Sequence, residues 1–186
     1  AREHPVQQAV LALIGELAGR SLKEAPSGVD GCGIPVAGMA LEHLAMAFAR
    51  FAAGDGLTGG RASAARQVYD AMIKEPFMVA GTDRWCTNAI EAGRGAFIVK
   101  TGAEGVYCAA IPEAGIGVAL KIDDGARRAS ECAMGAVLSK IPCLKAFFTD
   151  SPIELIRTPV NNVAGKTVGE IAPGPALQEL IITNRG

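Results

Sequence analysis

Lys100 is the residue whose type and position most clearly suggest a chemical role. It follows the apolar run 96–99, and Thr101 and Gly102 come directly after it. Such a lysine either extends from a strand end to solvent or forms a site cation at the edge of a sheet. In the second case it binds a substrate carboxylate or tunes a neighbouring hydroxyl. Thr101 would then supply a hydroxyl donor, and Gly102 would let a ligand approach the backbone.

The segment GVDGCGIP places Asp30 two residues before Cys32. One interpretation is an Asp-Gly turn followed by a small buried cysteine. The other is a thiolate metal ligand with a carboxylate nearby. A single cysteine cannot hold zinc, which takes three or four protein ligands. Because no second cysteine is close in sequence, the other ligands must come from the fold or from outside this chain.

The segment GTDRW predicts the start of a short helix, with Thr82 as its N-cap and Asp83 and Arg84 in its first turn. In one interpretation Asp83 stabilises the helix N-terminus and Arg84 lies on the surface. In the other, Thr82 or Arg84 binds a substrate carboxylate. Both remain open at this point.

The elements that must position these residues follow from hydrophobic spacing. Helices are predicted over 5–19, 37–51, 62–74, 82–93 and 127–141, and strand-like runs over 95–101, 105–111 and 116–122. The gaps between the strands fit tight connections, which favours an antiparallel meander. Strand alternation puts Ile98 and Lys100 on one face, with Phe97 and Val99 on the other.

The order of these elements predicts the α+β class, an antiparallel sheet flanked by helices. We expect one domain over 1–186, or the C-terminal portion of one. Residues 1–94 are mainly helical, 95–122 form the strands, 126–141 the covering helix, and 142–186 a short helix, strands and tail. A three-stranded sheet with one terminal helix is thin, so we expect further strands or another helix from elsewhere to complete it.

Composition narrows the functional classes. The chain has 186 residues, is 49% hydrophobic and carries a net charge of −1, which argues against nucleic-acid or membrane-surface binding. Apolar stretches are interrupted well before the roughly 20 residues of a membrane span. Five scattered cysteines argue against a disulfide framework and favour a reducing, cytoplasmic setting.

Four segments resemble the L-asparaginase II family, whose fold is like that of serine β-lactamases and penicillin-binding proteins. They are HPVQQAV at 4–10, GVDGCGIPV at 28–36, AGTDRWCT at 80–87 and the run KTGAEGVYCAAIPEAGIGVALKIDDG at 100–125. The Lys-Thr-Gly triplet is shared with those enzymes. The resemblance implies hydrolysis of L-asparagine to aspartate and ammonia through two Ser–Lys pairs. It also implies a zinc ion held by two cysteines and a lysine, and no organic cofactor.

Carried over residue by residue, the resemblance matches Lys100 to the lysine of the second pair. It matches Cys32 to one zinc ligand and Asp30 to the acidic residue close to it. No serine here is followed three residues later by lysine. We therefore expect the C-terminal half of such an enzyme, lacking the nucleophile of the first pair. The family also implies a homodimer.

Two other functions stay open at this stage. One is a different acyl-transfer enzyme of the same fold, such as a glutaminase or a penicillin-recognising enzyme, which the Lys-Thr-Gly triplet alone allows. The other is an inactive fragment or a partner-binding module, which the absence of Ser-x-x-Lys suggests.

Overall fold

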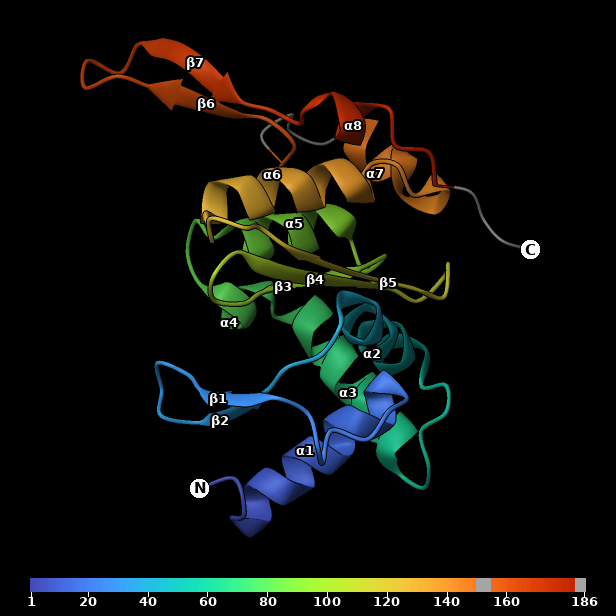
Figure 1. Cartoon of the computed structure of the whole chain (residues 1–186). Coiled ribbons are helices and arrows are strands. Elements are labelled where there is room, and N and C mark those ends of the chain that lie inside the picture. Colours follow the sequence, from blue (N-terminus) through green and yellow to red (C-terminus); the bar gives the residue numbers. More distant parts are fainter. Residues whose placement is uncertain (150–154, 183–186) are drawn as a thin grey trace.

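A three-stranded antiparallel sheet lies at the centre of the chain (Figure 1). The computed structural model describes residues 1–149 and 155–182. The strands are β3 (Ile98–Thr101), β4 (Val106–Ile111) and β5 (Ile116–Lys121), paired in that order. The two connections are tight because each contains a glycine with positive φ, Gly105 at 70° and Gly115 at 62°.

One face of the sheet is covered by α5 (Trp85–Gly93) and α6 (Arg127–Leu138), as Figure 1 shows. The apolar side chains between these layers form the main core, with Ile90, Phe97, Tyr107 and Met134 at most 1% exposed. Burial of such side chains contributes roughly 1.5–3 kcal/mol each. This layer therefore supplies most of the hydrophobic stabilisation.

The opposite face is covered by α2 (Leu41–Ala53), which packs on β4 and β5, and by α3 (Arg61–Lys74) near β3. Gly117 permits the close approach of α2, because a Cβ atom there would lie 1.8 Å from the carbonyl oxygen of Ala45. The core on this side is small. It consists of the buried residues Ala52, Tyr69, Ile98 and Ala110.

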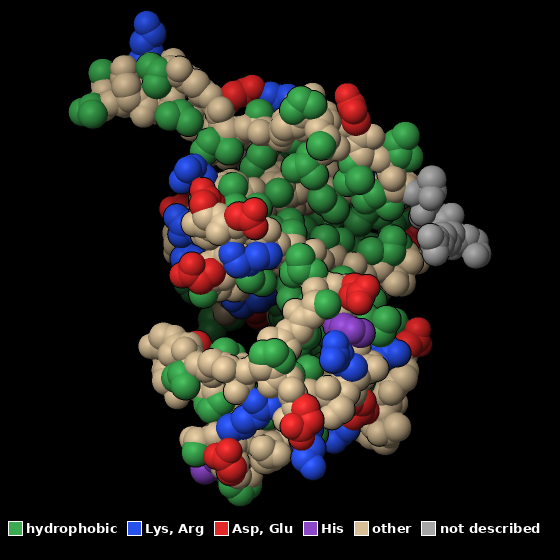
Figure 2. All heavy atoms as spheres, viewed as in Figure 1, with side chains coloured by type: hydrophobic (Ala, Val, Ile, Leu, Met, Phe, Trp, Pro, Cys, Tyr) green, Lys and Arg blue, Asp and Glu red, His purple; other side chains and the backbone are tan. Residues whose placement is uncertain are grey.

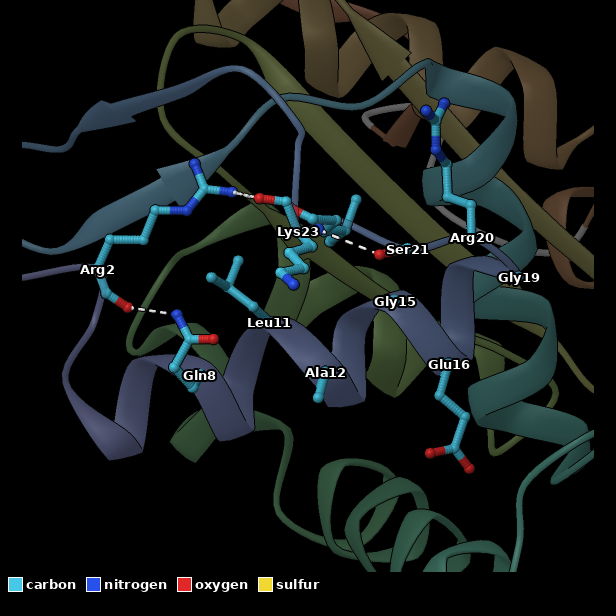
Figure 3. Close-up of a pocket in the computed structure, with 11 residues that line it drawn as sticks. Arg2, Gln8, Leu11, Ala12, Gly15, Glu16, Gly19, Arg20, Ser21 and Lys23 are labelled. Carbon is cyan, nitrogen blue, oxygen red and sulfur yellow. Dashed lines mark hydrogen bonds between the residues drawn. The ribbon is translucent and has the colours of Figure 1, made fainter.

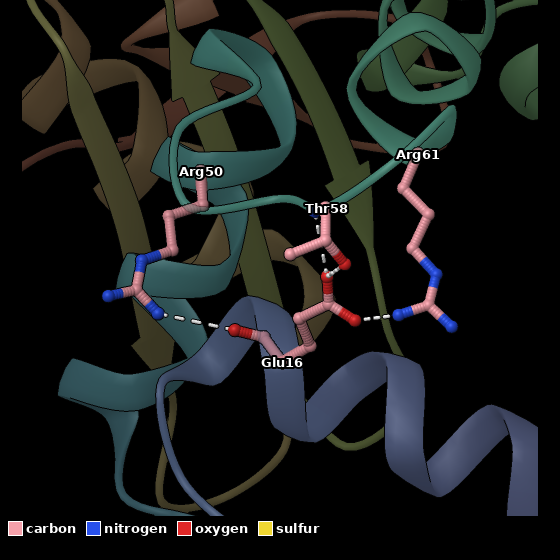
Figure 4. Close-up of polar contacts among 4 residues, drawn as sticks. All are labelled: Glu16, Arg50, Thr58 and Arg61. Carbon is pink, nitrogen blue, oxygen red and sulfur yellow. Dashed lines mark hydrogen bonds and ion pairs between the residues drawn. The ribbon is translucent and has the colours of Figure 1, made fainter.

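Beyond α2 lie α1 (Pro5–Ala18) and a hairpin of β1 (Ser27–Val29) and β2 (Pro35–Ala37). The short α4 (Pro76–Ala80) lies beside the sheet, where it contacts α5 and α3. The α1 helix begins with Pro5 at its first position and ends at Gly19, which takes a left-handed conformation. Glu16 ties it to the loop before α3 by accepting hydrogen bonds from Thr58 and Arg61 (Figure 4).

The C-terminal part packs on the far side of α6. It comprises the 3-10 helix η1 (Pro142–Leu144), α7 (Lys145–Thr149), a hairpin of β6 (Thr158–Asn161) and β7 (Thr167–Ile171), and α8 (Pro175–Gln178). Leu155 anchors this part, because its carbonyl oxygen accepts a hydrogen bond from the Trp85 indole at 3.2 Å. The same carbonyl lies against Gly135, where a Cβ atom would come within 2.0 Å of it.

The predicted α+β class and the antiparallel β3–β4–β5 meander are confirmed. Helices of this chain lie on both faces of the sheet. The expectation that further strands or another helix from elsewhere complete the sheet stays a prediction. Several bounds also differ: α2 begins at Leu41, α6 ends at Leu138, and Pro76 starts α4 as well as ending α3. The tail expected within 142–186 partly falls on 150–154 and 183–186, outside the described residues. Within the described part, every helix is too short or too polar to cross a membrane.

Candidate functional site

Lys100 lies in β3 with its side chain exposed, on the face that carries Ile98 and is turned toward α2 and α3. The predicted face is therefore confirmed. Its ammonium donates a hydrogen bond to the Thr101 carbonyl at 2.8 Å and forms no ion pair with a carboxylate in residues 1–149 and 155–182. Its cross-strand partner is Cys108. Burial raises the pKa of the Cys108 thiol to about 12, so that thiol stays neutral beside Lys100 at ordinary pH.

A groove of about 1080 Å³ opens next to Lys100. Its walls come from α1, α2, α3, α4 and β3 and are almost entirely apolar, including Phe48, Phe51, Met72 and Ile98. The charged residues among its lining are Lys100 and Glu75. Figure 2 shows the molecule hollowed between the β1–β2 hairpin and the sheet layer. Apolar side chains of the groove thus lie around the Lys100 ammonium. An anion that binds there and displaces water would be attracted to the ammonium more strongly than in open solvent.

Thr101 follows Lys100 but does not share its face. Thr101 pairs with Tyr107, whose side chain lies in the core under α5 and α6, so both project to that side. The Thr101 hydroxyl donates to the Gly102 carbonyl at 3.2 Å. At Gly102 a Cβ atom would lie 3.2 Å from the Cβ of Val106. A side chain at position 102 would therefore require Val106 to shift by a few tenths of an ångström.

Asp30 and Cys32 lie in the loop of the β1–β2 hairpin, on the side of the sheet to which Lys100 points (Figure 1). One carboxylate oxygen of Asp30 accepts hydrogen bonds from the backbone N–H groups of Cys32 and Ile34, both at 2.9 Å. The turn predicted for Asp30 is thus present. Cys32 is exposed rather than buried. Its sulfur is accessible because the backbone around it is held by Asp30.

The zinc that the sequence resemblance implies needs about four ligands. Within residues 1–149 and 155–182, no three Cys, His, Asp or Glu side chains gather in a way that could hold a metal ion. Asp30 already uses its carboxylate on the hairpin backbone. Cys32 fits a metal site only as one ligand among several that are supplied from elsewhere.

Thr82 and Arg84 lie on the other side of the sheet from Lys100, at the start of α5. The helix begins at Trp85 with Arg84 as N-cap, so the prediction of Thr82 as N-cap is wrong. Asp83 takes a positive φ of 54°, which a helical residue cannot have, and this turns the chain before Arg84. Thr82 is exposed in that turn.

The charge of Arg84 acts on two side chains, the partly buried Glu131 of α6 and the buried Tyr107 of β4. Burial raises the pKa of the Glu131 carboxyl, and the charges of Arg127 and Arg84 oppose that rise. The Arg84 charge also acts on Tyr107, whose phenol lies 2.7 Å from the Cys86 sulfur. Burial raises the pKa of Tyr107 well above its ordinary value. Sequence reasoning missed this group, since its members come from three separate stretches of the chain: Arg84 with Cys86, Tyr107, and Arg127 with Glu131.

A second cavity, of about 580 Å³, runs along α1 and is lined by Arg2, Gln8, Arg20 and Lys23 among others (Figure 3). Its basic lining suggests an anion site. However, the Arg2 guanidinium donates to the carbonyl oxygens of Leu22, Lys23 and Ala25 at 2.8–3.1 Å. That cation holds the loop after α1 in place and is already engaged.

The structure therefore brings together Lys100, the apolar groove and the hairpin that carries Asp30 and Cys32 on one side of the sheet. It sets Thr82 and Arg84 apart from them. The groove itself was missed, because its walls come from helices whose apolar stripes look like ordinary core positions. A protein-family model described as L-asparaginase II matches residues 1–173. No curated protein matches the chain.

Proposed function

This chain belongs to the L-asparaginase II family, and on that premise we propose that it hydrolyses the side-chain amide of L-asparagine by Ser–Lys acyl-enzyme chemistry. Lys100 is the residue of this chain that would serve the reaction. The single observation that carries this role is its position. Its ammonium lies at the edge of the groove without a carboxylate partner in the described residues.

The reaction transfers an acyl group twice. A serine oxygen attacks the carbon of the side-chain amide, and the serine proton passes to a lysine. That proton then goes to the amide nitrogen, the C–N bond breaks and ammonia leaves. Water attacks the resulting ester, aspartate is released, and the proton of the water returns to the serine oxygen. The Lys100 ammonium would stabilise the negative oxygen of the serine or of the tetrahedral intermediate.

The nucleophile needs a separate source. Because no Ser-x-x-Lys occurs in these 186 residues, we propose that the first Ser–Lys pair is supplied from outside them. The apolar walls of the groove agree with this, since asparagine carries an amide, an ammonium and a carboxylate that Lys100, Gln67 and Glu75 alone cannot satisfy. Thr101 projects to the other side of the sheet, so it would hydrogen-bond substrate only after its hydroxyl leaves the Gly102 carbonyl and its side chain turns toward Lys100.

We also propose Cys32 as one thiolate ligand of a shared zinc site, with Asp30 holding the loop that presents it. A zinc ion there would supply a positive charge that lowers the pKa of nearby lysines. To this zinc site, the chain would contribute the Cys32 thiolate and the β1–β2 hairpin that positions it.

The decisive assay measures ammonia release from asparagine for the protein and for two lysine variants. Lys100→Met should lower kcat/KM by about 10²-fold or more. Lys121→Met is the matched control, because Lys121 is an exposed strand-end lysine of β5 whose ammonium donates to the carbonyl of Ile122, the next residue. Equal rates for both variants and the parent would remove Lys100 from the mechanism. Glutamine and a chromogenic β-lactam in the same assay distinguish the other acyl-transfer functions.

Zinc content tests the second part of the proposal. Cys32→Ala should lose most of the bound zinc measured by elemental analysis, whereas Cys143→Ala, a half-buried cysteine, should retain it. If the zinc content of Cys32→Ala stays at the parental level, Cys32 is not a ligand.

A further inference from the structure

Glu75 is the one carboxylate among the described residues that line the groove beside Lys100. It lies where α3 ends and α4 begins, and its side chain is exposed. Within residues 1–149 and 155–182 this carboxylate has no ion pair and no side-chain hydrogen bond. Glu16, by contrast, binds Thr58 and Arg61 and so holds two elements together. The Glu75 carboxylate is therefore available to a ligand.

The backbone fixes the place from which the Glu75 side chain starts. Its N–H donates to the carbonyl oxygen of Ala71 at 2.9 Å, and its own carbonyl oxygen accepts from the N–H of Met78 at 3.0 Å. Pro76 follows as the first residue of α4, where its ring restricts φ. The base of this side chain is thus held on the groove wall while its carboxylate stays unpaired in the described part of the chain.

Glu75 and Lys100 lie on two surfaces that meet in the same groove. The α3 helix contacts β3, and Met72 of α3 packs against the small cluster that contains Ile98 of β3. Glu75 comes three residues after Met72, which is the next position on that face of the helix. Lys100 comes two residues after Ile98, which is the next position on that face of the strand. All four residues line the groove, so it carries a carboxylate on its helix side and an ammonium on its strand side.

Two opposite charges in an apolar groove match a small molecule that carries both charges itself. The substrate proposed above has an α-ammonium and an α-carboxylate besides its amide. An ammonium that enters an apolar groove loses its hydration, so it binds well only where a carboxylate or another acceptor replaces that water. The charge of Lys100 repels this ammonium, whereas the charge of Glu75 attracts it. Glu75 is therefore the group of this groove that fits the positive end of the substrate.

We propose that Glu75 binds the α-ammonium of the substrate and thereby selects amides of α-amino acids over amides that lack the amino group. This inference rests on the proposed amidohydrolase function and leaves its reaction unchanged. The ammonium donates charge-assisted hydrogen bonds to the Glu75 carboxylate. Glu75 is a binding residue and takes no part in proton transfer. The α-carboxylate of the substrate is left to groups supplied from outside this chain.

Ammonia release from asparagine and from succinamate, which is asparagine without its amino group, tests the proposal. Glu75→Gln keeps the size of the side chain and removes its charge. It should lower kcat/KM for asparagine at least about tenfold, chiefly through a higher KM, and change kcat/KM for succinamate less than about twofold. Glu75→Asp, which keeps the charge, should recover part of the loss. Glu91→Gln, an exposed change in α5 on the other side of the sheet, is the matched control and should leave both values unchanged.

The outcomes separate this inference from the proposed function. If the parent hydrolyses asparagine and Glu75→Gln lowers kcat/KM for neither amide, or for both equally, Glu75 does not bind the ammonium and the proposed function stands. If the parent releases no ammonia from asparagine, the proposed function is wrong. Isothermal titration calorimetry with the two amides then decides on Glu75, because Glu75→Gln should weaken the binding of asparagine alone. A parent that binds neither amide excludes the ammonium site.

Discussion

The two sides of the central sheet differ in how completely they are buried. Under α5 and α6 the large apolar residues are sealed from solvent, as Phe97 and Met134 illustrate at 1% and 0% exposure. On the α1–α4 side, Val68, Phe77 and Met78 are 52%, 56% and 78% exposed. We call the first side, under α5 and α6, the finished core, because its large apolar side chains are closed off from solvent. The second side leaves large apolar side chains exposed to solvent, and the proposed site lysine, Lys100, lies there.

The difference explains why Lys100 and Arg84 behave unlike each other. Arg84 lies on the side of the sheet covered by α5 and α6, where its charge acts on the partly buried Glu131 and the buried Tyr107. Lys100 points to the open side, and within residues 1–149 and 155–182 its ammonium has one hydrogen bond, to the carbonyl of Thr101. The charge of Arg84 thus acts on groups within the protein, whereas the charge of Lys100 lies at an open groove where a ligand can reach it.

The largest expected effect is a difference in stability between two alanine variants, one on each side of the sheet. Ile111→Ala, in the finished core and 0% exposed, should lower the free energy of unfolding by about 4 kcal/mol, because it removes buried methyl groups and leaves a cavity. Met78→Ala, on the open side, should change it by less than about 0.5 kcal/mol. Urea unfolding measures both. Similar losses would show that the open side is covered in solution.

A second test concerns how α2 is seated on the sheet. Gly117→Ala should cost about 3 kcal/mol, because the added Cβ would lie 1.8 Å from the Ala45 carbonyl oxygen and force α2 away from β5. Gly28→Ala is the matched control, since Gly28 is also in a strand and has no atom within 4 Å of the added Cβ. Comparable stabilities for the two variants would contradict the close contact.

The smallest expected effect concerns how steeply the free energy of unfolding falls with pH in alkaline solution. Burial raises the pKa of Tyr69 to about 12 from 10.0, so the folded state binds that proton more tightly than the unfolded chain. Its contribution is complete below pH 10 and is lost as the pH rises from about 10 to 12, at up to about 1.4 kcal/mol per pH unit. In Tyr69→Phe, the free energy of unfolding should therefore fall less steeply between pH 10 and 12, by up to about 1.4 kcal/mol per pH unit.

Two measurements check the pH effect. Urea unfolding at several alkaline pH values compares the slopes of the parent and of Tyr69→Phe. Absorbance titration of the folded chain should show Tyr107 ionising at higher pH than Tyr69, because Tyr107 lies in the finished core. An unchanged slope in Tyr69→Phe would mean that Tyr69 ionises equally readily in both states.

Sequence reasoning succeeded where the physical signal is local. Short glycine-containing gaps predicted the β3–β4–β5 meander, strand alternation predicted the face of Lys100, and the Asp-Gly pair predicted the turn at Asp30. The prediction of Thr82 as N-cap was wrong, because Asp83 has a positive φ and α5 begins only at Trp85. The residue types at 82–84 do not indicate this backbone conformation. Cys32 was expected either buried or bound, and its exposure depends on the hairpin standing away from the sheet layer.

The groove was beyond local reasoning for a different reason. Its walls join Ile14, Phe48, Val68, Met78 and Ile98, which belong to five separate elements. Each looks like a core residue in its own helix or strand. Only the packing of those elements shows that their apolar sides meet around an opening instead of closing it.

Trp85 is the single tryptophan of the sequence, and its indole N–H donates to the Leu155 carbonyl while its ring meets Tyr107 edge-on at 5.4 Å. The tryptophan fluorescence of this protein, excited selectively at wavelengths that tyrosine does not absorb, therefore comes from one known position. That position joins the sheet layer to the segment that follows α6. An emission spectrum recorded during unfolding would thus report the detachment of the C-terminal segment from the core, with no label required.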